Sequence, residues 1–148
     1  MKTVFEIQRI KQVALEATTN TKVISSPYDV AEIAKQTIGD EDREVVLVIC
    51  LNTHKDVIAI HKAHIGDVDS CPISCKEIFK AAILNSASTI AISHNHPSGT
   101  IQESQQDINA TKTLISAGDI LDIPVIDHVI VGFNNPNYNS LRTAGYFN

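Results

Sequence analysis

The stretch TIAISHNHPSG, residues 89–99, is the part of this 148-residue chain around which the rest can be placed. Its first half, 89–93, is short, apolar and β-branched, which is typical of a buried strand. That strand delivers the chain to a loop that begins with His94 and His96. Side chains two residues apart in extended backbone point the same way, so both imidazoles can meet one ion.

After this loop the sequence predicts one helix and two strands. Ser104 is a candidate N-cap for a helix that runs to about Ala117, and Gly118 is expected to end it. The run PVIDHVIVG at 124–132 predicts a strand, and residues 138–141 predict a short last one. Helical and extended segments therefore alternate through this half of the chain.

Before the loop the sequence predicts a helix, a hairpin and a second helix. Residues 28–38 have helical spacing, and Ser26 is the candidate cap. The β-branched runs 44–50 and 57–65 are separated by polar turn residues, which predicts a β-hairpin. Residues 75–86 follow a Ser-x-x-Glu pattern that is typical of a helical capping box.

Together these elements predict an α/β fold, with a mixed β-sheet flanked by helices. A chain of 148 residues with 43% apolar content is long enough for one domain with its own core. We expect residues 26–148 to form that domain. Residues 1–25 mix helical spacing with β-branched clusters, so we expect an N-terminal extension whose structure the sequence does not decide.

Composition argues against nucleic acid and membrane as partners. The net charge is −5, and the longest basic cluster is only Arg9 and Lys11, whereas duplex binders gather cations to displace phosphate counterions. The sequence has neither an apolar run of about 18 residues nor an export signal. An odd count of three cysteines does not fit a secreted disulfide framework. We therefore expect a cytoplasmic protein.

A metal site is predicted where the loop meets the next helix. Zinc accepts histidine nitrogen and carboxylate oxygen, and a catalytic site uses three protein ligands with water in the fourth position. Asp107 lies in the first turn of the predicted helix, which can face back over the strand end. Ser104-x-x-Asp107 by itself is also an ordinary helix N-terminus. In combination with the preceding histidines, it predicts one zinc ion held by His94, His96 and Asp107.

The order Glu, His-x-His-Pro, Ser eight residues on and Asp three beyond resembles the JAMM (MPN+, JAB1) metalloprotease motif. HNHPSG together with the later IDHVIVG is similar to the RadC branch of that family, and the similarity spans about 26–147. The resemblance implies a fold related to the cytidine deaminases, the same three zinc ligands and an upstream catalytic glutamate. Glu44 matches the family position for this glutamate, and Glu41 is the second candidate.

The resemblance also implies an activity, which is zinc-dependent hydrolysis of a peptide or isopeptide bond by metal-activated water. Glu44 would be the general base, and Ser104 would stabilise the oxyanion that forms on the carbonyl oxygen. A peptide or protein would be the substrate. Its identity and the oligomeric state do not follow from the sequence, and we expect the loops 66–73 and 100–103 to set specificity.

The chain departs from the family pattern in three places. Residues 100–103 are Thr-Ile-Gln-Glu, where RadC proteins commonly have a Pro-rich spacing, but the spacing itself is kept. Ser74 and Cys75 stand where many relatives have His-Pro. Longer members carry an N-terminal helix-hairpin-helix region, and this sequence is interpreted as a short form without it. Any role on DNA that depends on that region loses support.

Three other functions remain as alternatives. An MPN-type scaffold would keep the fold and bind partners without turnover, although it has no need of Glu44, Ser104 and the zinc ligands together. A DNA-repair-associated RadC protein would bind DNA in a salt-dependent way, which the acidic balance disfavours. A zinc deaminase would need the His-x-Glu and Pro-Cys-x-x-Cys signature, which the sequence lacks.

The remaining histidines and cysteines give weaker signals. Cys71 and Cys75 resemble half of a thiolate zinc site, but the second pair is absent, so incidental or structural thiols are favoured. His61 and His64 are three apart on a strand and are expected to point to opposite faces of the sheet. For His128 two interpretations stay open: a hydrogen-bonded core residue, or a partner that supports a ligand histidine.

Overall fold

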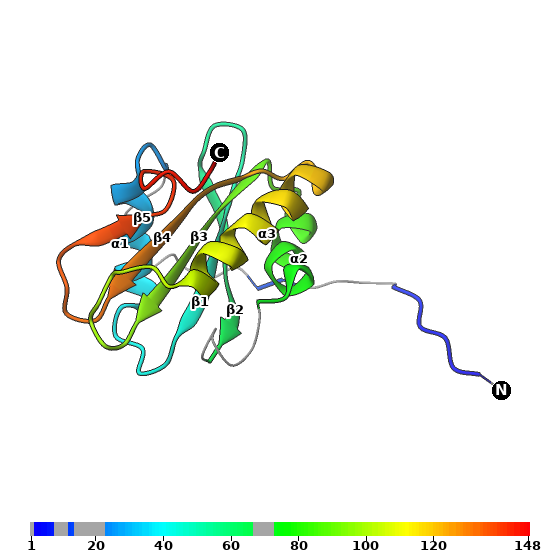
Figure 1. Ribbon diagram of the computed structural model, residues 1–148. Coiled ribbons are helices and arrows are strands. Elements are labelled where there is room, and N and C mark those ends of the chain that lie inside the picture. The colour runs from blue at the N-terminus through cyan, green and yellow to red at the C-terminus, as the bar shows by residue number, and fades with distance from the viewer. Residues whose placement is uncertain (1, 8–11, 14–22, 67–72) are drawn as a thin grey trace.

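The computed structural model describes residues 2–7, 12–13, 23–66 and 73–148 (Figure 1). Most of the expected extension 1–25 therefore lies outside the described residues, as do residues 67–72, which include Cys71. Val23 forms an antiparallel bridge with Asp56.

A five-stranded mixed sheet forms the centre of the molecule, in the order β2-β1-β3-β4-β5. β3 and β4 are parallel, and the other neighbouring pairs are antiparallel. This architecture confirms the mixed sheet expected from the sequence. The strands are β1 (Val45–Leu51), β2 (Val57–Ile65), β3 (Thr89–His96), β4 (Val125–Gly132) and β5 (Tyr138–Ser140).

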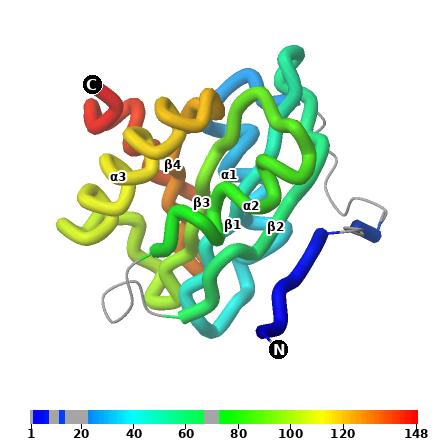
Figure 2. The backbone as a smooth tube through the Cα atoms, turned by 90° about the vertical axis from the view of Figure 1, so that its right-hand side faces the viewer, coloured from blue at the N-terminus to red at the C-terminus, as the bar shows by residue number. Residues whose placement is uncertain are grey.

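Helices cover both faces of this sheet, so that the domain has three layers (Figure 1). Figure 2 shows α2 and α3 together on one face and α1 on the other. In the described parts of the chain, none of the helices is long and apolar enough to cross a bilayer. The helices are α1 (Pro27–Ile38), α2 (Cys75–Leu84) and α3 (Gln105–Leu121).

β1 shows why this sheet is stable, because all seven of its residues are buried and they alternate between two cores. Val45 and Leu47 pack with Ile33 of α1 in one core. Val46 and Val48 face the other way and join the core beneath α2 and α3, which we call the α2–α3 face. The candidate metal ligands described below lie on this second face.

The cap of α3 agrees with the sequence prediction, and the cap of α2 does not. α2 begins after Ser74 as expected, but the Ser74 side chain makes no cap hydrogen bond, and Glu77 pairs instead with Lys80 at 3.0 Å. The capping box predicted at this position was therefore wrong. α3 begins after Ser104 with a complete capping box.

α3 does not end at Gly118, as the sequence predicted, but continues one turn to Leu121. It ends at Asp122, which takes the left-handed conformation (φ 57°). Gly118 serves packing instead: a Cβ added there would lie 2.6 Å from the carbonyl oxygen of Ile123. Glycine is therefore required at position 118 because the backbone of Ile123 packs against it, and not because the helix ends there.

We expect Gly118→Ala to destabilise the protein although alanine is the better helix former. The added methyl group would meet backbone oxygen below van der Waals distance, and overpacking of this kind costs about 1–3 kcal/mol. Urea unfolding compares this variant with Ser116→Ala, an exposed position of the same helix that should change stability little. Equal or higher stability of Gly118→Ala would contradict this explanation.

A β-bulge overturns the expectation that His61 and His64 face opposite sides of the sheet. His64 pairs with Val46 and His61 with Val48, so that both histidines share the α2–α3 face. The register shifts between Val46 and Leu47, which leaves Ala63 as the extra residue. One inserted residue reverses the alternation that the sequence rule assumes.

Candidate metal centre

β3 carries two of the candidate ligands within the strand itself. The strand runs on to His96, so the two histidines lie at its end in extended backbone, as their spacing predicted, and the loop begins only after them. The strand continues through both histidines because it has pairing partners there. β3 pairs with both β1 and β4 as far as His94, and with β4 as far as His96. A central strand with partners on both sides holds the two imidazoles rigidly.

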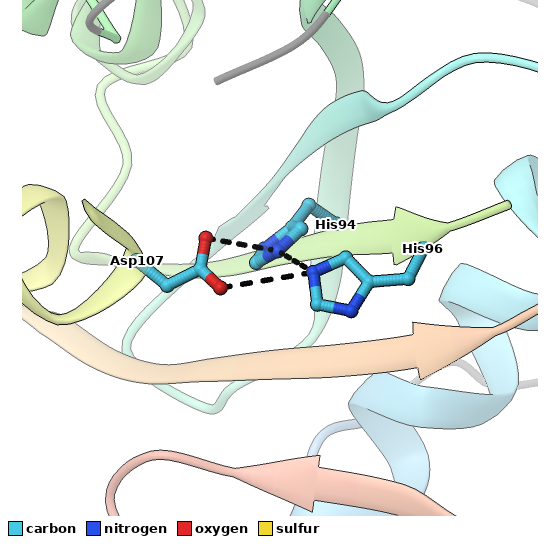
Figure 3. Close-up of side chains that lie close together, drawn as sticks. All are labelled: His94, His96 and Asp107. Atoms are coloured by element: carbon cyan, nitrogen blue, oxygen red, sulfur yellow. Dashed lines mark hydrogen bonds and ion pairs between the residues drawn. The ribbon is translucent and has the colours of Figure 1, made fainter. Parts of the chain in front are cut away.

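His94 and His96 point from β3 toward the start of α3, where the carboxylate of Asp107 faces them (Figure 3). The two Nε2 atoms lie 3.0 Å apart. His94 Nε2 is 3.3 Å from Asp107 Oδ1, and His96 Nε2 is 3.7 Å from Asp107 Oδ2. Among the described residues, these three side chains form a group that can hold a metal ion.

The capping box of α3 fixes the carboxylate of Asp107. Its backbone N–H donates to Ser104 Oγ at 3.1 Å, and its Oδ2 accepts from the Ser104 backbone N–H at 2.9 Å. The cap therefore orients the same carboxylate that faces the histidines. Asp107 is 4% exposed, and a buried acid without partners would be costly.

Asp107 and His96 shift each other's pKa values. Burial alone raises the pKa of Asp107, but the hydrogen bonds that the His94 and His96 rings donate when they are protonated outweigh it and hold that pKa far below its usual range. The hydrogen bond to Asp107 raises the pKa of His96, against the opposing effect of burial. The carboxylate is therefore ionised, and it attracts positive charge into the space that the three side chains enclose.

When it is neutral, the imidazole of His96 has its hydrogen on the side away from the cluster. His96 Nδ1 lies 3.1 Å from the carbonyl oxygen of Thr100, which can only accept a hydrogen bond. A neutral ring therefore keeps its hydrogen on Nδ1 and turns the lone pair of Nε2 toward Asp107. A lone pair next to an ionised carboxylate is the donor set that a cation needs.

Glu44 is the residue before β1, and it lies beside the three candidate ligands. Val46 pairs with His94, so Glu44 lies across from His96 and on the same face of the sheet. The charge of Glu44 also raises the pKa of His96. Glu44, His96, Ser104 and Asp107 line one cleft of about 320 Å³.

The other candidate acid, Glu41, is placed differently. Its carboxylate pairs with Lys62 Nζ at 2.9 Å. Lys62 lies opposite Leu47, which packs in the α1 core, so this ion pair belongs to the other face of the sheet. The structure therefore brings Glu44, and not Glu41, to the cleft.

Asn95, between the two histidines, is a positioning residue that the sequence reasoning missed. It points to the opposite face from His94, is 1% exposed, and its Oδ1 accepts from the backbone N–H of Val45 at 2.7 Å. Its Nδ2 donates to the carbonyl oxygen of Arg43 at 2.9 Å. One amide thus holds the backbone on both sides of Glu44.

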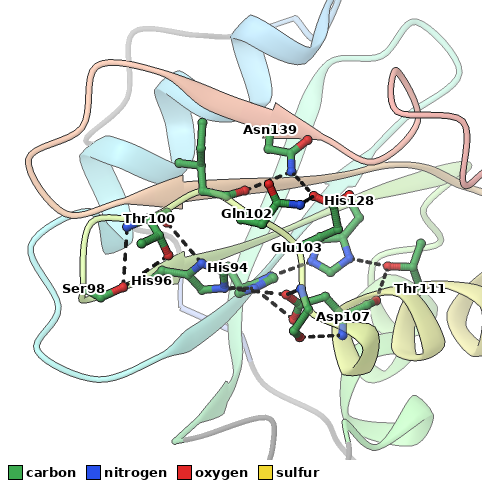
Figure 4. A network of polar contacts seen from close by, with 12 residues as sticks. His94, His96, Ser98, Thr100, Gln102, Glu103, Asp107, Thr111, His128 and Asn139 are labelled. Atoms are coloured by element: carbon green, nitrogen blue, oxygen red, sulfur yellow. Dashed lines mark hydrogen bonds and ion pairs between the residues drawn. The ribbon is translucent and has the colours of Figure 1, made fainter.

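The loop after His96 is held by two further side chains that the sequence reasoning missed. Asn135 Nδ2 donates to the carbonyl oxygen of Gly99 at 2.9 Å. Asn139 Nδ2 donates to the carbonyl oxygen of Ile101, also at 2.9 Å (Figure 4). Thr100, between them, accepts from His96. Consecutive carbonyl groups are thereby fixed, and with them the wall of the cleft.

Other nucleophilic or metal-binding side chains lie elsewhere. Cys50 is buried in β1, and burial raises its pKa to about 11, which keeps it an unreactive thiol. Cys75 is free at the start of α2, and Cys71, the other cysteine of the Cys-x3-Cys pattern, lies outside the described residues. His128 is buried, and burial and the neighbouring His94 lower its pKa to about 3.

Sequence comparisons agree with this geometry. The RadC-like JAB domain matches residues 24–146. A UPF0758 protein of Desulforamulus reducens is 41% identical over 123 residues, which are 83% of this chain and 53% of the relative. A UPF0758 protein of Rubrobacter xylanophilus is 40% identical over 123 residues, again 83% and 53%. The chain spans about half the length of these relatives, and it belongs to the RadC-like JAB domain family.

Proposed function

We propose that this protein is a zinc-dependent hydrolase of the JAMM type that cleaves a peptide or isopeptide bond. The observation that carries the proposal is the convergence of His94, His96 and Asp107, with Glu44 across the same cleft. This arrangement supplies three ligands and an acid that is not needed as a ligand, which is the composition of a catalytic rather than a structural zinc site.

The spacing of the three ligand atoms supports zinc. Zinc bonds of about 2.0 to 2.1 Å at tetrahedral angles would separate neighbouring ligand atoms by about 3.3 to 3.4 Å. The two Nε2 atoms are 3.0 Å apart, His94 Nε2 is 3.3 Å from Asp107 Oδ1, and His96 Nε2 is 3.7 Å from the other oxygen, Oδ2. With one ligand atom from each residue, the three atoms lie within 4.8 Å of one another, so adjustment of these side chains would bring them to the corners of a tetrahedron.

Solvent reaches the cluster from one side. The side chain of His96 is 11% exposed, whereas that of His94 is 1% exposed. His96 lines the cleft together with Glu44 and Ser104. The fourth position of the metal would therefore open toward Glu44, the proposed proton acceptor.

In the proposed reaction, water adds to the carbonyl carbon and the C–N bond breaks. Bound zinc would lower the pKa of a water molecule from 15.7 to about 7 and polarise the carbonyl group. Glu44 would take a proton from the attacking water and transfer it to the leaving amine, so that its carboxylate is regenerated. His94, His96 and Asp107 would hold the metal throughout, and Ser104 would donate its hydroxyl hydrogen to the oxyanion.

Two variants separate the capping role of Ser104 from its proposed role in the reaction. Ser104→Gly costs only a few tenths of a kcal/mol at an N-cap, so we expect nearly unchanged stability but about 100- to 1000-fold slower hydrolysis, because glycine has no side-chain hydrogen to donate to the oxyanion. Ser104→Ala should in addition destabilise the protein by about 1 kcal/mol. Thermal unfolding and steady-state kinetics measure the two effects. Full activity of Ser104→Gly would exclude the oxyanion role.

Activity of purified protein tests the proposal as a whole. Zinc-loaded and chelated samples are compared on libraries of peptides and of isopeptide-linked substrates. We expect cleavage that is lost on chelation and restored by zinc. Stoichiometric zinc without cleavage of any member would contradict the hydrolase proposal and favour the binding alternative.

A further inference from the structure

A chain of buried polar contacts links two of the proposed ligands behind the metal site (Figure 4). His94 Nδ1 lies 2.7 Å from His128 Nε2, and His128 Nδ1 lies 2.6 Å from Thr111 Oγ1. Thr111 Oγ1 donates to the carbonyl oxygen of Asp107 at 2.7 Å. The chain thus begins at a ligand on β3, passes through β4 and ends at a ligand on α3.

The residues of this chain of contacts are buried, so their polar atoms depend on one another for hydrogen bonds. His94, Thr111 and His128 are each 1% exposed, and Asp107 is 4% exposed. Water does not reach such groups freely, so each polar atom needs a protein partner. A single missing hydrogen bond would leave its partners unsatisfied.

The hydrogen positions in this chain follow from donor and acceptor counts. The carbonyl oxygen of Asp107 carries no hydrogen, so a contact of 2.7 Å requires the hydroxyl hydrogen of Thr111. Thr111 Oγ1 can then only accept from His128 Nδ1. A neutral His128 therefore has a bare Nε2, which must accept a hydrogen from His94 Nδ1.

We infer that His128, oriented by Thr111, is a positioning residue that holds His94 as the Nδ1–H tautomer with its Nε2 lone pair directed at the metal. The inference rests on the metal site of the proposed function, but it concerns this chain's own hydrogen bonds. If these hydrogen bonds ran in the opposite direction, His94 would carry its hydrogen on Nε2. That nitrogen could then not bind an ion. The protein thus selects the binding tautomer of His94 before metal arrives.

The two histidine ligands are oriented by different means. His96 donates from Nδ1 to a backbone carbonyl of the loop that follows it. His94 donates to a side chain on the neighbouring parallel strand, and that side chain is tied in turn to the helix of Asp107. The separation between His94 and Asp107 is therefore set by His128 and Thr111 as well as by the backbone.

Thr111→Val is the sharpest test, because it keeps the shape of the side chain and removes the acceptor of His128 Nδ1–H. Thr113→Val is the matched control, since Thr113 makes the same bond to the carbonyl four residues back in α3 but is exposed. Thr111→Ser should restore wild-type behaviour. His128→Phe removes both contacts of the ring.

Two measurements are made on each variant. Nitrogen-15 NMR of metal-free protein reports the imidazole tautomers, and chelator competition gives the zinc affinity. We expect His94 of the wild type to carry its hydrogen on Nδ1, and Thr111→Val to populate the Nε2–H form. Zinc affinity should fall about 10-fold in Thr111→Val and about 10- to 100-fold in His128→Phe.

Equal tautomers and equal zinc affinity in Thr111→Val and Thr113→Val would overturn the inference. A wild-type His94 that carries its hydrogen on Nε2 would overturn it as well. The Thr111 series decides the question even if His128→Phe does not fold. Failure of the hydrolase proposal is seen separately, because neither measurement requires turnover.

Discussion

Replacing Asp107 by alanine is expected to remove zinc from the protein. Asp107 is the negatively charged member of the group, and its pKa lies far below the usual range, so it offers an ionised carboxylate throughout the working pH range. Loss of a residue that only supports a ligand costs about 10- to 100-fold in metal affinity. Loss of the ligand itself should therefore cost at least about 100-fold.

Asp107→Asn makes this test stricter. It keeps the size of the side chain and an oxygen that can accept from the Ser104 backbone N–H, but it removes the charge. We expect it to lose zinc nearly as completely as Asp107→Ala, with a smaller loss of helix stability. Metal analysis after gel filtration measures the bound zinc, and Asp119→Ala, an exposed acid of the same helix, serves as the control. Stoichiometric zinc in Asp107→Asn would show that charge at this position is not required.

Glu44→Gln is expected to keep zinc and lose hydrolysis. The amide has nearly the shape of the carboxylate but cannot accept a proton from the attacking water. General base catalysis contributes about 100- to 10,000-fold, so kcat should fall by that factor. Because Glu44 is not one of the three converging ligands, the metal content should be unchanged.

Glu41→Gln is the matched control for this variant. It removes an acid three residues away whose partner, Lys62, lies toward the other face of the sheet. An exposed ion pair of this kind contributes about 0 to 1 kcal/mol, so stability and kcat should change little. Full activity in Glu44→Gln would show that Glu44 is not the general base. A loss of activity in Glu41→Gln alone would assign that role to Glu41.

The sequence predicted the architecture well where the signals are local. The β-branched runs on either side of the turn at residues 52–56 form the hairpin of β1 and β2. The alternation of strands and helices led to the mixed sheet, because few arrangements bury so many apolar faces at once. Ser104 and Asp107 form the cap that their spacing indicated.

Local rules failed where tertiary contacts decide. Gly118 looked like a helix end, but its place is set by the carbonyl of Ile123, which approaches it from the turn that follows the helix. The bulge at Ala63 changes the face of one histidine relative to the other without any mark in the sequence. Periodicity describes one element at a time and cannot report on the packing of its neighbours.

The candidate site shows the same division. Spacing and the family resemblance named the residues that converge, since His94 and His96 share a strand and Asp107 follows on the next helix. The supporting contacts could not be found in this way. His128 meets His94 across 34 positions of sequence, and Asn95 reaches back 50 positions to Val45. Such pairs become neighbours only through the order of strands in the sheet.

A crystal structure of the zinc-loaded protein, with anomalous data at the zinc edge, would show whether His94, His96 and Asp107 hold one metal ion. We predict one peak per chain, within about 2.0 to 2.2 Å of His94 Nε2, His96 Nε2 and an Asp107 oxygen, with solvent in the fourth position. A peak elsewhere, or a fourth protein side chain on the metal, would contradict the account.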